Sequence, residues 1–423
     1  MPKKKSKKKP KKAEEKIRKI KIKVIGIGGG GNSIIGDISS RMKGVRFVAA
    51  NTDSAALKRV GKKVRTFQFG EDLTGGMGTG MDFELGKQAA QKEKKRIKRL
   101  LKGQDFCIFV SCLGGGTGSG ATPIFAKASK ELGNLNFGIF TLPFKFEGEK
   151  KAEIARDALR KSKPYLQAFS IIPNERIFKI VDKKTPLKTA LSTINERLTE
   201  SLEGLIEMIK KPGFINIDFA DLQTILRQRN RVAFLNRIEF KRGAQKEIEK
   251  LIFSPLYPYD IKGARGLLFN IEGASKLGLG EVNEISRGLQ KLVGRKAKII
   301  FGITQKKGLG DKIGLTLLAT GCRMKGEILP KITKKPKRKR VKKKIKKEKV
   351  KVKVKVKALV KVKKVKPLPA KAPEEKGKEK EKQIIRRNAL QIKRELEEEE
   401  KERLEKEEIW EIPALLRREK QKE

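Results

Sequence analysis

Residues 114–120, Gly-Gly-Gly-Thr-Gly-Ser-Gly, constrain the fold of this chain more than any other stretch of its sequence. The apolar run 106–112 before them predicts a buried strand, and 121–132 after them predicts a helix. Glycines allow consecutive backbone N–H groups to turn toward an anion, and the hydroxyls of Thr117 and Ser119 can donate to phosphate oxygens. The loop lacks the Gly-Lys-Ser/Thr of a P-loop, so no lysine is aimed at the terminal phosphates. The stretch therefore predicts a phosphate-binding turn between a strand and a helix.

A second glycine-rich loop lies earlier in the chain. Residues 26–31 fit the pattern G-x-G-x-x-G between a predicted strand at 20–27 and a predicted helix at 33–42. Asp53 follows Gly31 by 22 residues, as the ribose-binding carboxylate does in dinucleotide-binding proteins, so an NAD-binding protein is one interpretation. Two phosphate-binding turns on one sheet instead favour a nucleoside triphosphate that lies across it. Two tight turns without a ligand are the remaining alternative.

Strand and helix patterns alternate through the first half of the chain. Further strands are predicted at 45–50 and 137–141, with a basic helix at 84–102. This alternation predicts a parallel sheet with helices on both faces and ligands at the carboxyl ends of its strands. A long amphipathic helix at 186–210 ends at Pro212-Gly213. Beyond residue 235 the pattern predicts a smaller mixed α/β domain with its own sheet, from helices at 243–253 and 280–293 and strands at 266–271, 298–304 and 313–320.

The net charge of +55 is distributed unevenly along the chain. Residues 1–23 carry +11 and residues 331–366 carry +20, which leaves +24 for the segment 24–330. Like charges at this density repel and cannot bury apolar surface, so both basic runs are predicted to be disordered. Within the second, the Lys-Val alternation at 349–357 indicates either an extended linker or a strand with a basic face for lipid or nucleic acid. The charge is therefore not evidence for a DNA-binding fold.

The residue types that the chain lacks exclude several kinds of site. It contains no His, which excludes metal sites and Ser-His or Cys-His catalysis built on imidazole. Three scattered Cys exclude a disulfide framework and indicate a reducing cytosol. The N-terminal basic run is not a secretory signal peptide, and no window reaches the roughly 18 apolar residues of a membrane span.

The end of the chain combines a charged segment with an apolar one. Residues 383–408 mix acidic and basic side chains at helical spacings and predict a solvated helix. Residues 409–423 follow it and contain the single Trp of the chain. An apolar cluster at the end of a disordered tail is typical of a docking peptide. The candidate docking residues are Trp410, Ile412, Pro413, Leu415, Leu416 and Arg417.

The glycine-rich stretch 114–120 resembles the signature loop of tubulins and of the bacterial division GTPase FtsZ. Other stretches look like FtsZ segments in FtsZ order: 23–32, 51–53, 141–148, 172–174, 216–221 and 263–266. The resemblance covers roughly 20–325, and 411–418 looks like the FtsZ C-terminal recognition peptide. It implies an α/β fold class. The expected architecture is a tubulin-like, Rossmann-type parallel-sheet GTPase domain with a long central helix, a second smaller mixed α/β domain, and disordered basic arms.

The resemblance also implies where the domains begin and end. We expect a basic arm at 1–19, a GTP-binding domain at 20–210, and a catalytic loop with its following helix at 211–235. A C-terminal α/β domain at 236–328 is then followed by a basic linker at 329–382, the charged helix at 383–408 and the docking peptide at 409–423.

Roles for individual residues follow from the same resemblance. Glu147 would accept hydrogen bonds from the ribose hydroxyls, while Asn174 and Asn195 would bind the guanine edge, whose donors and acceptors an amide can match. Asn216, Asp218 and Asp221 would form a catalytic loop that acts on the nucleotide of a neighbouring subunit, with the two carboxylates orienting the attacking water. For Asp218 and Asp221, an ordinary helix start is the alternative. The remaining GTP-binding candidates are Gly29, Gly30, Gly31, Asn32, Ser33, Gly115, Gly116, Thr117, Gly118, Ser119 and Lys151.

Several positions differ from the usual FtsZ pattern. Ser33 stands where Asn is usual, Leu191 where an aromatic residue often stacks on the base, and Asn195 where Asp is frequent. Lys151 replaces an arginine directed at phosphate and loses its bidentate geometry. The basic segment 227–242 lacks the glycines that FtsZ carries there. These differences concern GTP affinity, guanine selectivity and filament geometry, and they leave the catalytic acids in place.

The function that the resemblance implies is a GTPase that polymerises head to tail into the filaments of a division ring, with hydrolysis at the subunit interface. GTP and GDP are the expected ligands, with Mg²⁺ held mainly by phosphates and water and no dedicated protein metal site. The expected partners are further copies of the chain, a membrane-bound adaptor for the tail peptide and anionic lipid for the lysine-rich arms, without a requirement for nucleic acid. The expected location is the cytoplasm at the division site. A tubulin-like DNA-segregation filament, an inert nucleotide-binding polymer and an NAD-binding Rossmann protein are the alternatives.

Overall fold

The computed structural model describes residues 20–323, apart from positions 43, 183, 227–230, 275–276 and 307. The expectations for the N-terminal arm, the linker, the charged helix and the docking peptide lie outside these residues. Within them, no helix is long and apolar enough to cross a bilayer.

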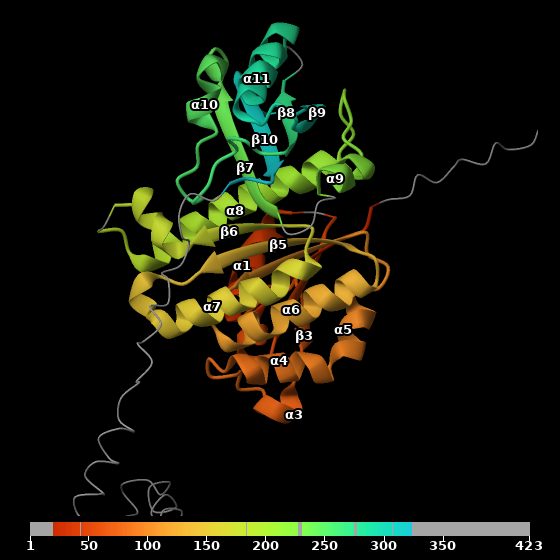
Figure 1. Cartoon of the computed structure of the whole chain (residues 1–423), viewed down its shortest axis with the longest axis vertical. Helices are drawn as coiled ribbons and strands as arrows, with labels where there is room; N and C mark the ends of the chain where they lie inside the picture. The colour runs from red at the N-terminus through yellow and green to blue at the C-terminus, as the bar shows by residue number, and fades with distance from the viewer. Residues whose placement is uncertain are drawn as a thin grey trace, which may run out of the picture. The chain divides into compact units, whose positions relative to one another are not determined.

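Ten strands form one sheet in the order β3-β2-β1-β4-β5-β6-β7-β10-β8-β9 (Figure 1). Strands β1 to β7 run parallel, β10 is antiparallel to both β7 and β8, and β9 is parallel to β8. The first six strands are β1 (Ile22–Ile27), β2 (Arg46–Asn51), β3 (Arg65–Gln68), β4 (Phe106–Cys112), β5 (Leu135–Leu142) and β6 (Ala168–Pro173). The last four are β7 (Arg231–Lys241), β8 (Gly266–Gly273), β9 (Lys298–Gln305) and β10 (Lys312–Thr320).

Helices cover both faces of the parallel part of this sheet. The helix α1 (Gly28–Arg41) packs with α8 (Leu187–Lys210) on one face, and on the other face α6 (Gly116–Glu131) is surrounded by α4, α5 and α7 (Figure 1). Every residue of β1, β5 and β6 is buried, because helices shield both sides of these strands from water. The other helices and 3₁₀ turns are α2 (Ser54–Lys58), α3 (Glu71–Thr74), α4 (Phe83–Lys92), α5 (Lys94–Leu101), η1 (Lys145–Glu147), α7 (Glu149–Ser162), η2 (Lys163–Tyr165), η3 (Asn174–Lys179), α9 (Phe219–Leu226), η4 (Ala244–Glu247), α10 (Ile248–Leu251) and α11 (Leu279–Leu292).

The strand β7 joins the two parts of the sheet. Its first two residues pair in parallel with Ala168 and Phe169 of β6, and the strand then pairs along nine positions with antiparallel β10. The second sheet that the sequence predicted is therefore continuous with the first. The sequence did not predict β7, since polar residues such as Asn236 and Arg237 interrupt its apolar run although both are buried here. The basic helix predicted at 84–102 is also divided, because α4 ends and α5 begins on either side of Glu93.

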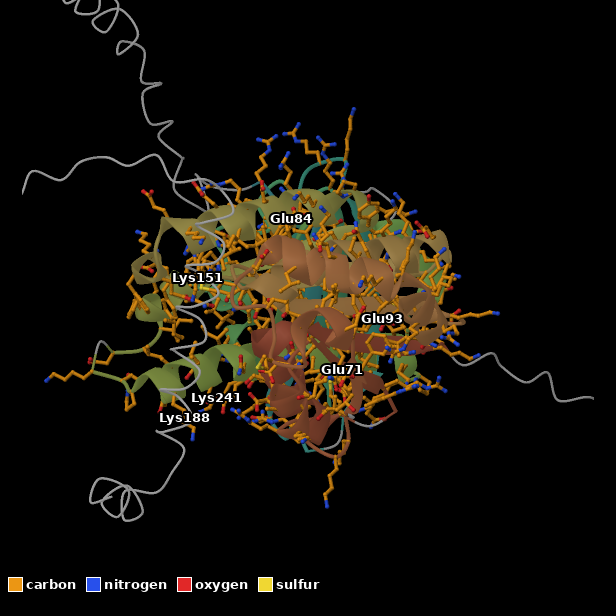
Figure 2. The ribbon with its side chains drawn as sticks, turned by 90° about the horizontal axis from the view of Figure 1, so that it is seen from below. Glu71, Glu84, Glu93, Lys151, Lys188 and Lys241 are labelled. Carbon is orange, nitrogen blue, oxygen red and sulfur yellow. The ribbon has the colours of Figure 1, made fainter. Side chains whose placement is uncertain are left out.

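Positive charge is spread over the surface of the folded part. Figure 2 shows nitrogen-tipped side chains projecting around the whole outline of the ribbon in that view, with carboxylates such as Glu71, Glu84 and Glu93 among them. Many of these cations pair locally with acids, as Lys92 does with Asp72 at 2.8 Å. Exposed pairs of this kind contribute little to stability, so the surface charge does not explain the fold.

Candidate nucleotide-binding site

Two helices begin side by side at the carboxyl edge of the sheet, the edge at which the parallel strands end. The helix α1 starts at Gly28 directly after β1, and α6 starts at Gly116 just after β4, the neighbouring parallel strand. The first backbone N–H groups of a helix have no partner within it and carry partial positive charge, so they attract anions. The strand order thus places two anion-binding helix ends next to each other.

The close approach of the two loops requires glycine. Gly28 has a φ of +76°, and a Cβ on it would lie 2.8 Å from the backbone nitrogen of Gly118. On Gly116, a Cβ would lie 2.2 Å from Oγ1 of Thr79 and 2.6 Å from the carbonyl oxygen of Asp82. A Cβ carbon that lies within about 3 Å of a backbone atom overlaps it. Any larger residue at these two positions would therefore force the segments apart.

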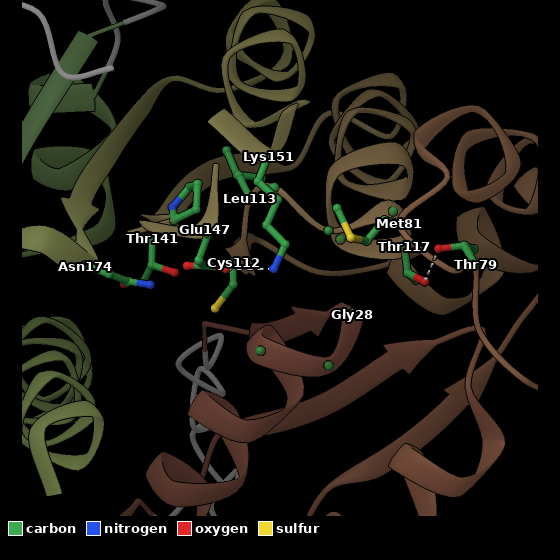
Figure 3. A pocket seen from close by; sticks show the side chains of 17 residues that line it. Gly28, Thr79, Met81, Cys112, Leu113, Thr117, Thr141, Glu147, Lys151 and Asn174 are labelled. Atoms are coloured by element: carbon green, nitrogen blue, oxygen red, sulfur yellow. Dashed lines mark hydrogen bonds and ion pairs between the residues drawn. The ribbon is translucent and has the colours of Figure 1, made fainter. Parts of the chain in front are cut away.

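These loops line a cavity of about 280 Å³, near the lower end of the range for small-molecule sites (Figure 3). The ends of β4 and β5 contribute Cys112 and Thr141, and η3 contributes Asn174. The full lining is Gly28, Gly29, Gly30, Thr79, Met81, Cys112, Leu113, Gly114, Gly115, Gly116, Thr117, Gly118, Thr141, Pro143, Glu147, Lys151 and Asn174. Backbone N–H groups and short polar side chains therefore dominate the walls.

Three threonine hydroxyls meet beside the cavity, and two of them belong to residues that line it. Oγ1 of Thr117 lies 2.7 Å from Oγ1 of Thr52 and 3.2 Å from Oγ1 of Thr79, and the second contact is dashed in Figure 3. A hydroxyl can donate one hydrogen bond and accept others, so Thr117 can contact its neighbours and an anion together. Ser119 has a different role, because its Oγ is fully buried and accepts a hydrogen bond from the Gly114 N–H at 2.8 Å. Ser119 therefore stabilises the conformation of the glycine-rich loop 114–120 and does not face the cavity.

One ion pair faces the cavity. Nζ of Lys151 lies 2.8 Å from Oε2 of Glu147, and Figure 3 shows the ammonium group beside that carboxylate. Oε1 of Glu147 accepts a hydrogen bond from the Phe144 N–H at 2.8 Å, which fixes the carboxylate in place. Burial raises the pKa of the Cys112 thiol, so this neighbour stays uncharged. Lys151 therefore adds positive charge beside the two helix ends.

Nine of the fourteen predicted GTP-binding residues line this cavity, and five do not. Asn32 is buried behind the first loop, where its amide nitrogen, oriented to satisfy its hydrogen bonds, lies 2.9 Å from the Gly26 carbonyl oxygen. Ser33 is exposed, and Nδ2 of Asn195 donates to Oδ2 of Asp37 at 2.9 Å. Gly31 and Ser119 are the other two. The nine lining residues are Gly29, Gly30, Gly115, Gly116, Thr117, Gly118, Glu147, Lys151 and Asn174.

A third glycine-rich loop reaches the cavity and was not predicted. Residues 75–81 supply Thr79 and Met81 to the lining. Their sequence, Gly-Gly-Met-Gly-Thr-Gly-Met, carried a signal in its four glycines, all of which adopt a positive φ. Met81 adopts φ +68°, the left-handed region that is rare for any residue with a Cβ. The remaining lining residues at strand ends, such as Thr141, carry no sequence signal of their own.

The predicted catalytic loop lies at the opposite, amino edge of the sheet. The ring of Phe219, at the start of α9, lies 6.5 Å from that of Phe106, the first residue of β4, whereas the cavity lies at the last residue of the same strand. A strand of seven residues separates its ends by about 20 Å. The structure therefore does not bring this loop to the cavity of its own chain.

Within the loop, the two acids hydrogen-bond each other's backbone. The Asp221 N–H donates to Oδ1 of Asp218 at 2.7 Å, and the Asp218 N–H donates to Oδ2 of Asp221 at 3.1 Å. This reciprocal arrangement caps the start of α9. Oδ1 of Asn216 accepts from the Gly213 N–H at 2.5 Å. Asn216 and Asp218 are nevertheless exposed. The carboxylates of Asp218 and Asp221 each use one oxygen in these hydrogen bonds and keep the other free of them.

Metal ligands are sparse in the described part of the chain. No group of three or more His, Cys, Asp or Glu side chains there is placed to hold a metal ion. Glu147 is the one carboxylate among the cavity residues.

Comparison with known proteins assigns both halves of the folded region. Residues 21–182 match the GTPase domain of the tubulin/FtsZ family, and residues 237–323 match the C-terminal domain of the FtsZ family. The cell division protein FtsZ of Coxiella burnetii is 36% identical over 303 residues, which are 71% of this chain and 78% of that protein.

Solved structures agree with this assignment. An empty FtsZ dimer from M. jannaschii superposes with a TM-score of 0.66 at 32% identity, over 74% of this chain and 96% of that one. The GTPγS-bound protofilament of CetZ2 from Haloferax volcanii reaches a TM-score of 0.62 at 20% identity, over 80% and 100% of the two chains, and supports the fold alone. These findings confirm the expected fold class and the GTPase activity. From its sequence and its structure, this chain is a GTPase of the tubulin/FtsZ family.

Proposed function

We propose that the chain polymerises head to tail, and that the catalytic loop of each subunit completes the nucleotide cavity of the next. The observation that carries this proposal is the separation of the two parts. The cavity opens at the carboxyl edge of the sheet and the loop with Asp218 lies at the amino edge. Stacking copies along the strand direction brings these edges together, and such a heterologous contact repeats into a filament.

In this assembly GTP binds first to one subunit. The N–H groups at the starts of α1 and α6 bind its phosphates together with Thr117 and Lys151. Glu147 accepts hydrogen bonds from the ribose hydroxyls. Its carboxylate is also paired with Lys151, so the lysine and the ribose must share it. Asn174, which lines the cavity, binds the guanine edge, and Asn195 joins it only after releasing Asp37.

Hydrolysis then requires the second subunit. Asp218 and Asp221 use their free carboxylate oxygens to orient the attacking water, while Asn216 approaches the terminal phosphate. When bound, Mg²⁺ would neutralise negative charge on the phosphates. Because the cavity itself offers one carboxylate, we propose that phosphate oxygens and water hold most of the ion's coordination sites.

We further propose that the filament serves cell division in the cytoplasm, the process named for the relative from Coxiella burnetii. The apolar tail peptide around Trp410 would bind a membrane-associated adaptor, and the basic runs 1–23 and 331–366 would contact anionic lipid. No step requires nucleic acid. Sedimentation with anionic vesicles, neutral vesicles or DNA separates these partners, and binding to DNA alone would favour a DNA-segregating filament instead.

The decisive test is GTP turnover measured against protein concentration. A site shared between subunits predicts almost no hydrolysis below a threshold concentration and a steep rise above it, at the concentration where filaments begin to sediment. Turnover strictly proportional to protein concentration, with no sedimenting material, would contradict the shared site.

A further inference from the structure

Six charged side chains of alternating sign form a connected series behind the catalytic loop, which we call the ion chain. Its members, in order of contact, are Lys211, Glu207, Lys306, Glu272, Arg237 and Glu239. They come from the end of α8, the residue after β9, and the strands β8 and β7. The ion chain therefore crosses from the central helix to the C-terminal part of the sheet.

The arginine and glutamate at the centre of the sheet half of the ion chain are buried. The side chains of Arg237 and Glu272 are 8% and 2% exposed, and Nη2 of the arginine lies 2.8 Å from Oε2 of the glutamate. Helix α8 passes close to this pair, because a Cβ on Gly204 would lie 2.8 Å from Cδ of Arg237. A buried pair of this kind holds its geometry firmly, since separating its charges leaves one of them uncompensated.

Lys306 is the bridge between the two halves. Its Nζ lies 3.4 Å from Oε2 of Glu207 and 3.4 Å from Oε2 of Glu272. In the described part of the chain, Lys306–Glu207 is the only ion pair between α8 and the residues of β7 to β10 or their immediate ends. Burial alone would raise the pKa of Glu207, yet Lys211 and Lys306 lower it, so the carboxylate is ionised and the pair is charged at neutral pH.

Removing Lys306 divides the ion chain without leaving a buried charge alone. Glu272 keeps Arg237, and Glu207 keeps Lys211. A variant at this position therefore loses the ion-pair connection between helix and sheet but keeps the pairs within each.

The segment that this connection supports carries the catalytic candidates. Helix α8 ends at Lys210, and the N–H groups of Phe214 and Ile215 then donate to the Ile303 carbonyl oxygen at 2.7 and 3.2 Å. Three residues after Ile303, Lys306 itself is fixed by its N–H, which donates to the Gly273 carbonyl oxygen at 2.9 Å. The loop that leads to Asp218 is therefore held at its start by two contacts. The ion chain holds the end of α8, and the backbone hydrogen bonds to β9 hold Phe214 and Ile215.

We infer that Lys306 is a positioning residue for GTP hydrolysis, because its ion pair with Glu207 fixes the end of α8 against the sheet and thereby the placement of Asn216, Asp218 and Asp221 on the neighbouring nucleotide. The inference rests on the proposed function of that loop. It concerns the rate within the filament, since no part of the ion chain lines the nucleotide cavity.

The test compares Lys306→Met with Lys306→Arg in the full-length chain, and uses Lys298→Met as the matched control. Lys298 begins β9, the strand that Lys306 follows, and it is exposed and forms none of the described ion pairs. We measure phosphate release per sedimented subunit well above the threshold, together with affinity for a fluorescent GTP analogue. Lys306→Met should lower turnover about tenfold with unchanged affinity, at the low end of the losses known for residues that orient metal ligands. Lys306→Arg, whose guanidinium can reach both carboxylates, and Lys298→Met should remain within about twofold of the parent.

Parental turnover in Lys306→Met, or equal losses in Lys306→Met and Lys306→Arg, would overturn the inference. If Lys306→Met does not fold, Glu207→Gln decides, because it breaks the same connection and keeps Lys306 with Glu272; the same tenfold loss is expected, and parental turnover refutes the role. Asp218→Ala separates the two proposals. Full activity of Asp218→Ala overturns both, whereas an inactive Asp218→Ala beside a fully active Lys306→Met overturns the positioning role alone.

Discussion

The nucleotide cavity and the catalytic loop differ in how complete they are within one chain. Two helix starts, glycines without room for a Cβ and the Thr117 hydroxyl are already arranged around the cavity. In the loop, Asp218 and Asp221 cap each other's backbone and lie at the edge of the sheet opposite the cavity of their own chain. This difference is the one that the proposed shared site requires, in which one subunit binds GTP and a second subunit is needed for its hydrolysis.

The sharpest separation of the two regions comes from Asp218→Ala. Loss of the carboxylate that orients water should reduce turnover by about 10²–10⁴-fold, while GTP affinity stays at the parental value because the cavity is untouched. Phosphate release and fluorescent-nucleotide binding are measured on the same preparation. Loss of the cap also costs about 1 kcal/mol of stability, so a melting curve should accompany both measurements. A comparable fall in affinity would show that the regions are not independent.

The reverse result is expected from Gly115→Val. Gly115 lines the cavity, has φ −88°, and a Cβ there meets nothing within 4 Å, so the variant should fold. Its side chain would keep phosphates from the N–H groups, and losing two charge-assisted hydrogen bonds lowers GTP affinity by about a hundredfold. Gly61→Val, at another position with open space, is the matched control for the substitution itself. Parental affinity in Gly115→Val would place the phosphates elsewhere.

A smaller effect within the cavity is expected from Lys151→Met. The variant removes the ammonium beside Glu147 and should weaken GTP binding about tenfold, with turnover at saturating GTP changed less. Lys151→Arg should retain most of the affinity, because it keeps the charge. Lys150→Met changes the preceding exposed lysine, so a similar loss in that control would attribute the effect to general surface charge.

The smallest expected effect is a partial recovery of activity when the Asp218→Ala and Gly115→Val variants are mixed. In a random equimolar copolymer of Asp218→Ala and Gly115→Val, about a quarter of the interfaces join an intact cavity to an intact loop. At a GTP concentration too low to occupy the Gly115→Val cavity, phosphate release should therefore recover to about a quarter of the parental rate, although each variant alone is nearly inactive there. A mixture as inactive as its components would argue that both parts act within one subunit.

The sequence located the cavity well because its signals are local. Glycine-rich turns between a strand and a helix predict anion-binding backbone wherever they occur, and nine of the predicted residues line the cavity. Ser119 and Asn32 carry the same sequence signal as Thr117, but the direction of a side chain in a tight loop depends on what packs behind it. For β7, the buried partner of Arg237 is Glu272 of β8, far along the chain, and no local pattern reports it.

The sequence by itself determined the alternation of strands and helices and the two phosphate-binding turns, because these depend on periodicity and on glycine at fixed spacings, while its motifs carried the resemblance to the family. Only the tertiary structure decided that residues 75–81 join the cavity, that β7 makes one sheet of two, and that the cavity and Asp218 lie at opposite edges. The physical reason is that strand order and direction fix which chain segments meet. Those are set by the burial of the whole sheet rather than by any one segment.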